Sequence, residues 1–448
     1  MSALAIIFTL IAAAAILAAP RRWAAMPFLV AACYMTMGQK IDLGLFSLHM
    51  VRLLIAAGII RVVMRREWVV GGLNGLDKIM LVWASWALVS SAFHEATSEG
   101  NPLVFRLGLA YNVLGIYFLM RIFVQSLEDV ERVLKVTACL FIPVALEMLQ
   151  EQITRHNLFA IFGGVGENVI VRNERLRAQG PFMHPILAGT VGAVCFPYMV
   201  GLYRKHAAIA GAGAAACVIM VVASGSSGPL MSLIFGIFAL SLWRWRHLTR
   251  QMRLAIVFGY IFLDIVMKAP AYYLIARIDL TGSSTGWHRA YLIESGLAHL
   301  REWWFAGTDY TRHWMPTGVS WSPEHTDITN HYLQYGVIGG LPLMLLFMGA
   351  LGVAFRYVGQ CLRAAEEASW EDQFFIWALG AALLGQAATC ISVSFFDQSY
   401  MFLFLNLALI GSLWAVQNRT ASEQSIEEED QQEGEEFANP LNAWRRCS

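Results

Sequence analysis

Four side chains that can hold an anion or move a proton precede one long apolar run. The stretch VRNERLRAQGPFMHPILAG, residues 171–189, contains Arg172, Arg175, Arg177 and His184. A guanidinium stays charged and forms paired hydrogen bonds with phosphate or carboxylate oxygens. A histidine, with an ordinary pKa near ~6.5, exchanges a proton close to neutral pH. The stretch predicts an anion site; the alternatives are a solvated loop face paired with Glu174 for Arg172 and Arg175, and a simple helix start for His184.

A second polar patch leads directly into another apolar run. The sequence WSPEHTDITNHYLQYG, residues 321–336, contains His325 and His331. His331 is expected at the outer end of a helix, beside any cavity that the preceding loop covers; helix capping or packing is the alternative. Glu324, His325 and Asp327 are residue types that bind metals, but nothing in their spacing is diagnostic of a metal site, and no metal is expected.

Between these two segments we expect an amphipathic helix over 286–304, capped by Ser284 or Thr285. One face is apolar at helical spacing and holds Ala290, Ile293, Leu297, Leu300 and Trp304. A more polar face holds His288, Leu292, Ser295, His299 and Glu302. This pattern predicts a helix that lies along the membrane–water boundary, with Arg289 directed toward the mouth of a bundle.

The composition requires a membrane to bury the rest of the chain. Of 448 residues, 57% are hydrophobic and only 14% are charged, and the mean hydropathy is +0.53. A soluble protein of this size carries roughly a quarter charged residues. Apolar runs near the ~20 residues that cross a bilayer recur along most of the chain. The sequence therefore predicts an all-α, polytopic transmembrane helical bundle.

About twelve or thirteen spans are expected within one transmembrane domain, residues 1–416. The runs lie near 3–19, 24–38, 49–64, 79–94, 103–120, 134–150, 185–203, 207–223, 229–243, 254–268, 336–355, 373–391 and 401–416. Two long loops, 151–184 and 269–335, separate them. The remaining segment, 417–448, is acidic and too polar to fold alone, so we expect it to be disordered.

Basic residues in the short connections set the expected orientation. If the helices alternate, one side of the membrane receives Arg21, Arg22, Arg61, Arg65, Arg66, Arg121, Arg132, Lys135, Arg204, Lys205, Arg244, Arg246, Arg250, Arg253, Arg356 and Arg363. The positive-inside rule makes that side cytoplasmic, together with the acidic tail. Both long loops then face outward, and the arginines of 171–189 lie where a lipid phosphate is the natural partner.

Two more arginines lie inside apolar runs. Arg52 and Arg106 are both near the outer ends of their expected helices. A charge at bilayer depth costs at least ~2.5 kcal/mol and usually faces a partner or a water-filled cavity. We therefore count both as candidate substrate-binding residues, with snorkelling to the outer headgroups as the alternative.

Several classes of protein are excluded. Neither long loop contains a cysteine, so no disulfide framework or cysteine-based metal site is available there. A Walker A loop, a Rossmann fingerprint and an HExxH motif are all missing from the sequence, which argues against a nucleotide-driven pump or a zinc protease.

Taken together, these motifs resemble the superfamily of O-antigen ligases and O-antigen or exopolysaccharide polymerases. The first part of the resemblance is Arg177, Gly180, Phe182 and His184-Pro185, and the second is Arg289 after Gly282-Ser283, then Asn330-His331 before Gly336 and Gly339. The order, the loop lengths and the number of spans are also similar over most of residues 130–415. The turn SGSSGPL, residues 224–230, departs from the pattern because it lacks the arginine that many relatives carry there.

The resemblance implies a metal-independent, inverting glycosyltransferase without a cofactor. Its donor would be a glycan on a polyprenyl (undecaprenyl) pyrophosphate, and its acceptor a hydroxyl of another glycan or of lipid A–core. His331 would take the acceptor proton, with Arg177 and Arg289 as the other catalytic residues. Substrate binding would fall to Arg172, Arg175, His184, Arg106, Arg52 and His325. The expected location is the bacterial inner membrane, multi-pass, with the active site facing the periplasm and no nucleic-acid partner.

Two rival classes remain open at this point. A transporter or flippase of lipid-linked glycans would place ionisable residues near the membrane midplane, often with broken helices. A non-catalytic scaffold would explain the hydropathy but not the set of arginines and histidines. The expected outward clustering of charge favours chemistry at the outer leaflet. Ligase and polymerase are not distinguished.

Overall fold

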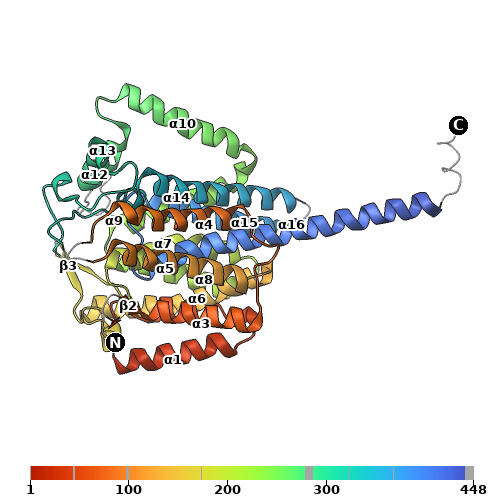
Figure 1. Ribbon diagram of the computed structural model, residues 1–448, viewed down its shortest axis with the longest axis horizontal. Helices are drawn as coiled ribbons and strands as arrows, with labels where there is room; N and C mark the ends of the chain where they lie inside the picture. Colours follow the sequence, from red (N-terminus) through yellow and green to blue (C-terminus); the bar gives the residue numbers. More distant parts are fainter. Residues whose placement is uncertain are drawn as a thin grey trace.

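The computed structural model describes residues 2–43, 46–96, 100–172, 174–277, 286–320, 322–366 and 368–438. Most of its helices lie side by side along the long axis of the molecule (Figure 1). The bundle contains α1 (Ala3–Ala18), α2 (Met26–Tyr34), α3 (Met50–Arg65), α4 (Gly75–Ser90), α5 (Pro102–Phe123), α6 (Leu127–Thr154), α7 (Pro185–Leu202), α8 (Ala207–Ala223), α9 (Ser227–Ser241), α14 (His331–Ala364), α15 (Trp370–Thr389) and α16 (Ser399–Ala438).

The remaining elements are short, apart from α10 (Thr249–Val266), which stands away from the bundle in Figure 1. Near it in the chain follow α11 (Leu274–Arg277), α12 (Gly286–Ala298) and α13 (Leu300–Trp303). Two antiparallel hairpins pair β1 (Lys40–Leu43) with β2 (Phe46–His49) and β3 (Ile170–Arg172) with β4 (Arg175–Arg177). The hairpins, α12 and α13 gather at one end of the bundle, so both long loops lie at the same end (Figure 1).

The all-α polytopic bundle is confirmed, and each apolar run of the sequence falls on a helix. Among the described residues, seven helices are long and apolar enough to cross a membrane, or eight if Leu254–Val266 and Ala271–Arg277, bent by 93°, form one span. This is fewer than the expected twelve or thirteen. The difference arises because several apolar helices are short; α2, with 9 residues, covers only about 14 Å of a bilayer core of about 30 Å.

The centre of the bundle is formed by α7, which packs against α8, α9 and α15. Small residues allow these close approaches, as is common between membrane helices. A Cβ atom at Gly189 would lie 2.4 Å from Ser224 Oγ, and one at Gly201 would lie 2.6 Å from Ala378 Cβ. Because α7 begins at Pro185, this packing fixes the position of the polar stretch that precedes it.

At the end of the bundle away from the long loops, buried basic residues pair with carboxylates. Arg121 Nη2 lies 3.0 Å from Asp77 Oδ2, and neither side chain is exposed. Arg61 Nη2 lies 2.7 Å from Glu67 Oε1. The positive charges that the sequence places on this side are thus locally neutralised where they are buried.

Helix α16 begins in the bundle and continues beyond it as far as Ala438 (Figure 1). It therefore extends into the acidic segment for which the sequence predicts disorder. Glutamate and glutamine have good helix propensity, and a segment that continues an existing helix needs no new nucleus. Residues 439–448 of the expected tail lie outside the described residues.

Helix α14 is interrupted at Gly339 and Gly340, and Gly340 has a φ of 77°. The carbonyl groups that lose their helical partners are satisfied from outside α14, as buried backbone in a membrane requires. Arg106 Nη2 donates to Ile338 O at 2.6 Å, and Trp86 Nε1 donates to Gly339 O at 2.7 Å. Thr308 N donates to Val337 O at 2.9 Å, which joins the long loop to the break.

Replacing Arg106 with methionine should lower the midpoint temperature of thermal unfolding. It leaves the Ile338 carbonyl buried without its charged donor, which costs roughly 1–3 kcal/mol. Trp86→Phe is the matched control because it removes one neutral donor at the same break and should have a smaller effect. Differential scanning fluorimetry of the detergent-solubilised protein measures both. Equal midpoints for Arg106→Met and the unmodified protein would contradict this role.

The helix expected over 286–304 is divided in two at His299, where the backbone leaves helical geometry between α12 and α13. Its buried side includes Leu292, and it packs on α14, where a Cβ at Gly296 would lie 3.0 Å from Leu333. Of the expected apolar face, Leu297 and Trp304 are exposed but Ala290 is fully buried. The proposed caps, Ser284 and Thr285, and the Gly282-Ser283 turn lie outside the described residues.

Candidate anion-binding pocket

A pocket of about 1000 Å³ opens at the end of the bundle that carries the long loops. Its walls come from segments far apart in the chain, including the hairpin β3–β4, the start of α9, α12 and the segment 308–329. Six of the nine site residues expected from the sequence line it, namely Arg106, Arg172, Arg177, His184, Arg289 and His325. The described lining does not include Arg52, Arg175 or His331.

Arg177 is held in the wall by the turn between α8 and α9. Its Nη2 donates to Ser226 Oγ at 2.6 Å, and its Nε donates to Ser224 O at 3.3 Å. The segment after its strand is held by α6, because Glu151 Oε2 accepts hydrogen bonds from Gln179 N at 3.0 Å and Gly180 N at 2.9 Å. The turn at residues 224–230, which lacks the arginine that many members of the resembling superfamily carry, is therefore contacted by the guanidinium of Arg177 instead.

Arg289 approaches the same turn from α12. Its Nε donates to Ser392 O at 3.0 Å, and a Cβ at Gly228 would lie 3.5 Å from its Nη2. The sequence-based expectation that Arg289 points into the mouth of the bundle is consistent with this position. Arg177 and Arg289 are only 7% and 8% exposed, so both charges are largely removed from water.

Arg172 adds a third positive charge near the other two. Burial lowers the pKa of Arg177 and of Arg289, and the charge of Arg172 lowers each pKa further, while Asp327 has a smaller opposite effect on Arg289. In the part of the chain that the structure describes, none of these three guanidinium groups forms an ion pair with a carboxylate, in contrast to the paired arginines at the opposite end. Three neighbouring cations without such partners favour a bound anion.

The first turn of α9 faces the same space. Ser226, Ser227 and Gly228 line the pocket at the start of this helix. Ser226 does not cap α9, because its Oγ donates to Ser224 O at 2.9 Å and accepts from Arg177. A helix N-terminus offers backbone N–H groups and a positive dipole end to an anion, so it adds to the charge of the arginines.

His184 lies at the N-cap of α7 and is partly buried in the pocket wall. Its Nδ1 accepts a hydrogen bond from Ile186 N at 3.1 Å. Burial, assisted by the charges of Arg177 and Arg172, lowers its pKa to about 4. The ring is therefore neutral near pH 7 and carries its proton on Nε2, so His184 can donate a hydrogen bond to a ligand but has no free lone pair.

His331 is buried at the start of α14, beside the pocket. Its ring contacts three aromatic rings, with centroid distances of 4.6 Å to Tyr335, 5.4 Å to Phe347 and 5.6 Å to Phe395. Its Nδ1 lies 3.0 Å from Oε1 of Gln334, which does line the pocket. The ring therefore packs among aromatic side chains with its Nε2 lacking a hydrogen-bond partner among the described residues, and Gln334 rather than His331 lines the pocket wall.

Among the lining residues to which no role was assigned from the sequence are two titratable ones, His288 and Asp327. His288 precedes Arg289 in α12, and Asp327 lies across the loop. Burial lowers the pKa of His288, while the charge of Asp327 raises it and that of Arg289 lowers it. His288 is thus neutral near pH 7 and shares the pocket lining with a carboxylate that acts on its charge, a combination suited to accepting a proton. The sequence feature that could have identified His288 as a site residue is its position directly before Arg289.

The other expected residues have different surroundings. Arg175 is exposed on β4, and Arg52 Nε donates to Asn112 Oδ1 at 3.2 Å within the bundle. His325 lines the pocket with its Nδ1 2.8 Å from Ser322 Oγ. Glu324 also lines the pocket. His94, which lies shortly after α4, has its Nδ1 2.6 Å from Oδ1 of Asp309 and so connects this part of the bundle with the segment 308–329.

Comparison with known proteins gives no match: no family model matches the chain, and neither does any curated protein. The fold and the pocket by themselves define the class. The chain is a polytopic helical membrane protein with a large, arginine-lined pocket at one end of its bundle.

Proposed function

We propose that the protein transfers a glycan from a polyprenyl pyrophosphate to a sugar hydroxyl, as the O-antigen ligases and polymerases do. The observation that carries this proposal is the convergence of Arg172, Arg177 and Arg289 on one pocket, where none of the three forms an ion pair with a carboxylate of the described residues. A pyrophosphate that departs from a sugar gains negative charge. Fixed guanidinium groups and the start of α9 stabilise that charge as it develops.

The pocket is large for a site that binds small molecules. Its volume of about 1000 Å³ is at the upper end of the range usual for small-molecule sites, ~300–1,000 Å³. The acceptor oxygen attacks the anomeric carbon, the bond from that carbon to the pyrophosphate oxygen breaks, and the acceptor proton moves to a base. A single displacement of this kind inverts the anomeric centre.

His288 is the residue that best fits the base. It lines the pocket, as Asp327 does, and burial lowers its pKa, whereas His331, the base expected from the sequence, lies among aromatic rings behind Gln334. His184 then serves as a donor to the pyrophosphate through Nε2–H.

By the positive-inside rule, the pocket faces away from the cytoplasm. In the bacterial inner membrane that the family resemblance implies, this side is the periplasm. The paired arginines near Asp77 and Glu67 then lie at the cytoplasmic end. This orientation gives the pocket access to lipid-linked glycans of the outer leaflet and to lipid A–core. A cysteine-accessibility measurement on Ser320→Cys, in the exposed loop, tests it with an impermeant maleimide in spheroplasts.

The activity is tested with purified protein in nanodiscs and a polyprenyl-pyrophosphate oligosaccharide, with and without lipid A–core. A ladder of products from the donor alone identifies a polymerase. A single shift that requires lipid A–core identifies a ligase. If donor binds but no new glycosidic product forms with either acceptor, the proposal fails and a transporter or flippase of the same lipids takes its place.

A further inference from the structure

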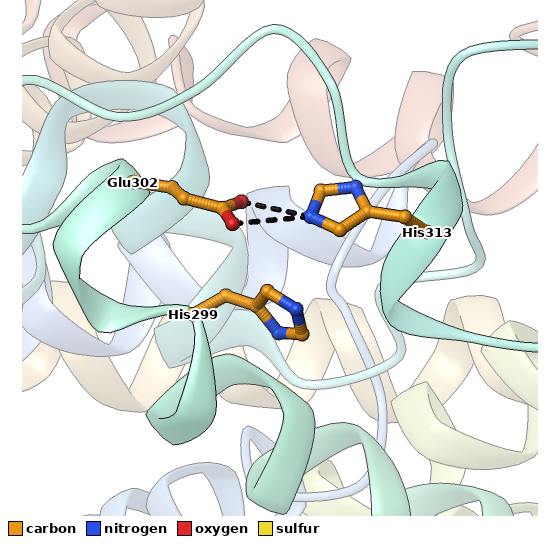
Figure 2. Close-up of side chains that lie close together, drawn as sticks. All are labelled: His299, Glu302 and His313. Carbon is orange, nitrogen blue, oxygen red and sulfur yellow. Dashed lines mark hydrogen bonds and ion pairs between the residues drawn. The ribbon is translucent and has the colours of Figure 1, made fainter.

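A second cluster of potential ligands lies in the long loop, outside the pocket lining. It brings together His299 at the break between α12 and α13, Glu302 in α13 and His313 in η6 (Arg312–Trp314), and the three side chains point toward one another (Figure 2). His313 Nε2 lies 2.9 Å from Glu302 Oε2 and 3.2 Å from Oε1. The ring centroids of His299 and His313 are 4.7 Å apart.

Neighbouring groups fix the orientation of each of these side chains. The Nδ1 of His299 lies 2.8 Å from Ser295 O, and since a carbonyl only accepts, Nδ1 carries the proton and Nε2 keeps its lone pair. Trp314 Nε1 donates to Glu302 Oε2 at 3.2 Å. The His313 ring stacks on Tyr310 at 5.1 Å. Metal-binding histidines and carboxylates typically have such outer partners.

We propose that His299, Glu302 and His313 form a binding site for a zinc ion. Two imidazoles and one carboxylate are a common zinc ligand set, with a fourth position left for water. Calcium and magnesium prefer oxygen ligands, so they fit this set less well. The ligand atoms lie within 4.8 Å of one another, and bonds of about 2.0–2.2 Å in a tetrahedral site require a separation of about 3.4 Å. Small side-chain rotations bring them to that distance.

The ion would join two parts of the loop that wall the pocket. His299 and Glu302 belong to the pair of helices that carries Arg289, and His313 belongs to the segment that carries Asp327. Thr311 N and Arg312 N, next to His313, donate to Glu324 O at 3.0 and 2.9 Å. Zinc would therefore hold the position of the segment 308–329 relative to α12. This role does not depend on the reaction proposed for the pocket.

The test uses full-length protein in nanodiscs, purified with a histidine-free tag and stripped of metal with a chelator. Titration with Zn²⁺ by calorimetry should show one site, and Co²⁺ should give the visible absorption bands of a tetrahedral complex. Loss of an outer partner alone typically weakens metal binding about 10–100-fold, so His299→Ala and His313→Ala should each weaken Zn²⁺ binding at least about 100-fold. Zn²⁺ should also raise the unfolding midpoint of the unmodified protein.

Two further variants separate a metal site from a simple ion pair. Glu302→Gln keeps a hydrogen-bond acceptor for Trp314 but supplies a poor zinc ligand, so it should weaken binding like the histidine variants. His206→Ala is the matched control, because His206 Nε2 also lies near a carboxylate, 3.6 Å from Glu131 Oε2, at the other end of the bundle. It should leave Zn²⁺ binding unchanged. Equal Zn²⁺ binding by the unmodified protein and by the His299→Ala/His313→Ala double variant would overturn the proposal.

Discussion

The double variant Arg177→Ala/Arg289→Ala should lose nearly all glycan transfer. A hydrogen bond to a charged group contributes about 1.5–3 kcal/mol, so removal of either arginine should lower kcat/KM by roughly 10- to 150-fold. If the two act independently, the double variant should lose on the order of 10²–10⁴-fold. Both groups are almost fully buried, and their positive charge is most valuable where the leaving pyrophosphate becomes more negative.

Single-turnover rates with a polyprenyl-pyrophosphate glycan measure this loss, and donor binding is measured separately in nanodiscs. Arg175→Ala is the matched control for Arg177, since it lies two residues away on β4 but is exposed outside the pocket lining. Arg301→Ala is the control for Arg289 because it is exposed on α13. Controls as inactive as the double variant would show that total positive charge, rather than the pocket, governs the reaction.

Lysine replacements test the geometry of the same interaction. Arg177 uses two nitrogens to contact the 224–226 turn, and a lysine cannot reproduce that fork. Arg177→Lys and Arg289→Lys should therefore recover only part of the lost rate. Full activity in both would mean that the arginines act as simple point charges.

The sequence located much of this pocket because charge in an apolar chain is costly and hence informative. The loops that carry Arg177, His184 and Arg289 lie on the same side of the membrane if successive helices alternate in direction. This alternation alone predicts that the three residues lie at one end of the bundle. The positions of the two guanidinium groups were not predictable. Arg177 contacts Ser226 and Arg289 lies beside Gly228, and these two residues belong to an uncharged segment that is distant from both arginines in the chain.

Burial explains contacts that the sequence did not predict for two of the expected site residues. His331, which lies outside the pocket lining, and Arg106, which lies in it, are both near helix starts, and their residue types alone suggested contact with a ligand. Packing places His331 among Tyr335, Phe347 and Phe395, and the break at Gly340 recruits Arg106 to the Ile338 carbonyl. A pair of glycines indicates close packing but does not reveal that a helix is interrupted, because that depends on which outside donors satisfy the freed carbonyls.

The base should be identified by the pH dependence of transfer. A base must be neutral to accept a proton, so kcat/KM is lost as the pH falls through its pKa. Burial lowers the pKa of His288 from its ordinary value of 6.5; Asp327 has a smaller effect that raises the pKa, and Arg289 has a smaller effect that lowers it further. The acid limb of the profile is therefore expected below pH 6.5, with full activity above it. Since the pKa of His184 is about 4, His184 does not titrate in the upper part of this range.

His288→Ala should lower kcat by about 10²–10⁴-fold, the usual contribution of a general base, and should abolish the acid limb. Asp327→Asn removes the charge that raises the pKa of His288, so it should shift the limb to lower pH while retaining more activity than His288→Ala. His331→Ala removes a buried ring from an aromatic cluster, so it should mainly lower the unfolding midpoint. If instead His331→Ala folds normally, loses transfer and loses the acid limb while His288→Ala retains both, then His331 is the base and the pocket must rearrange around Gln334 when substrate binds.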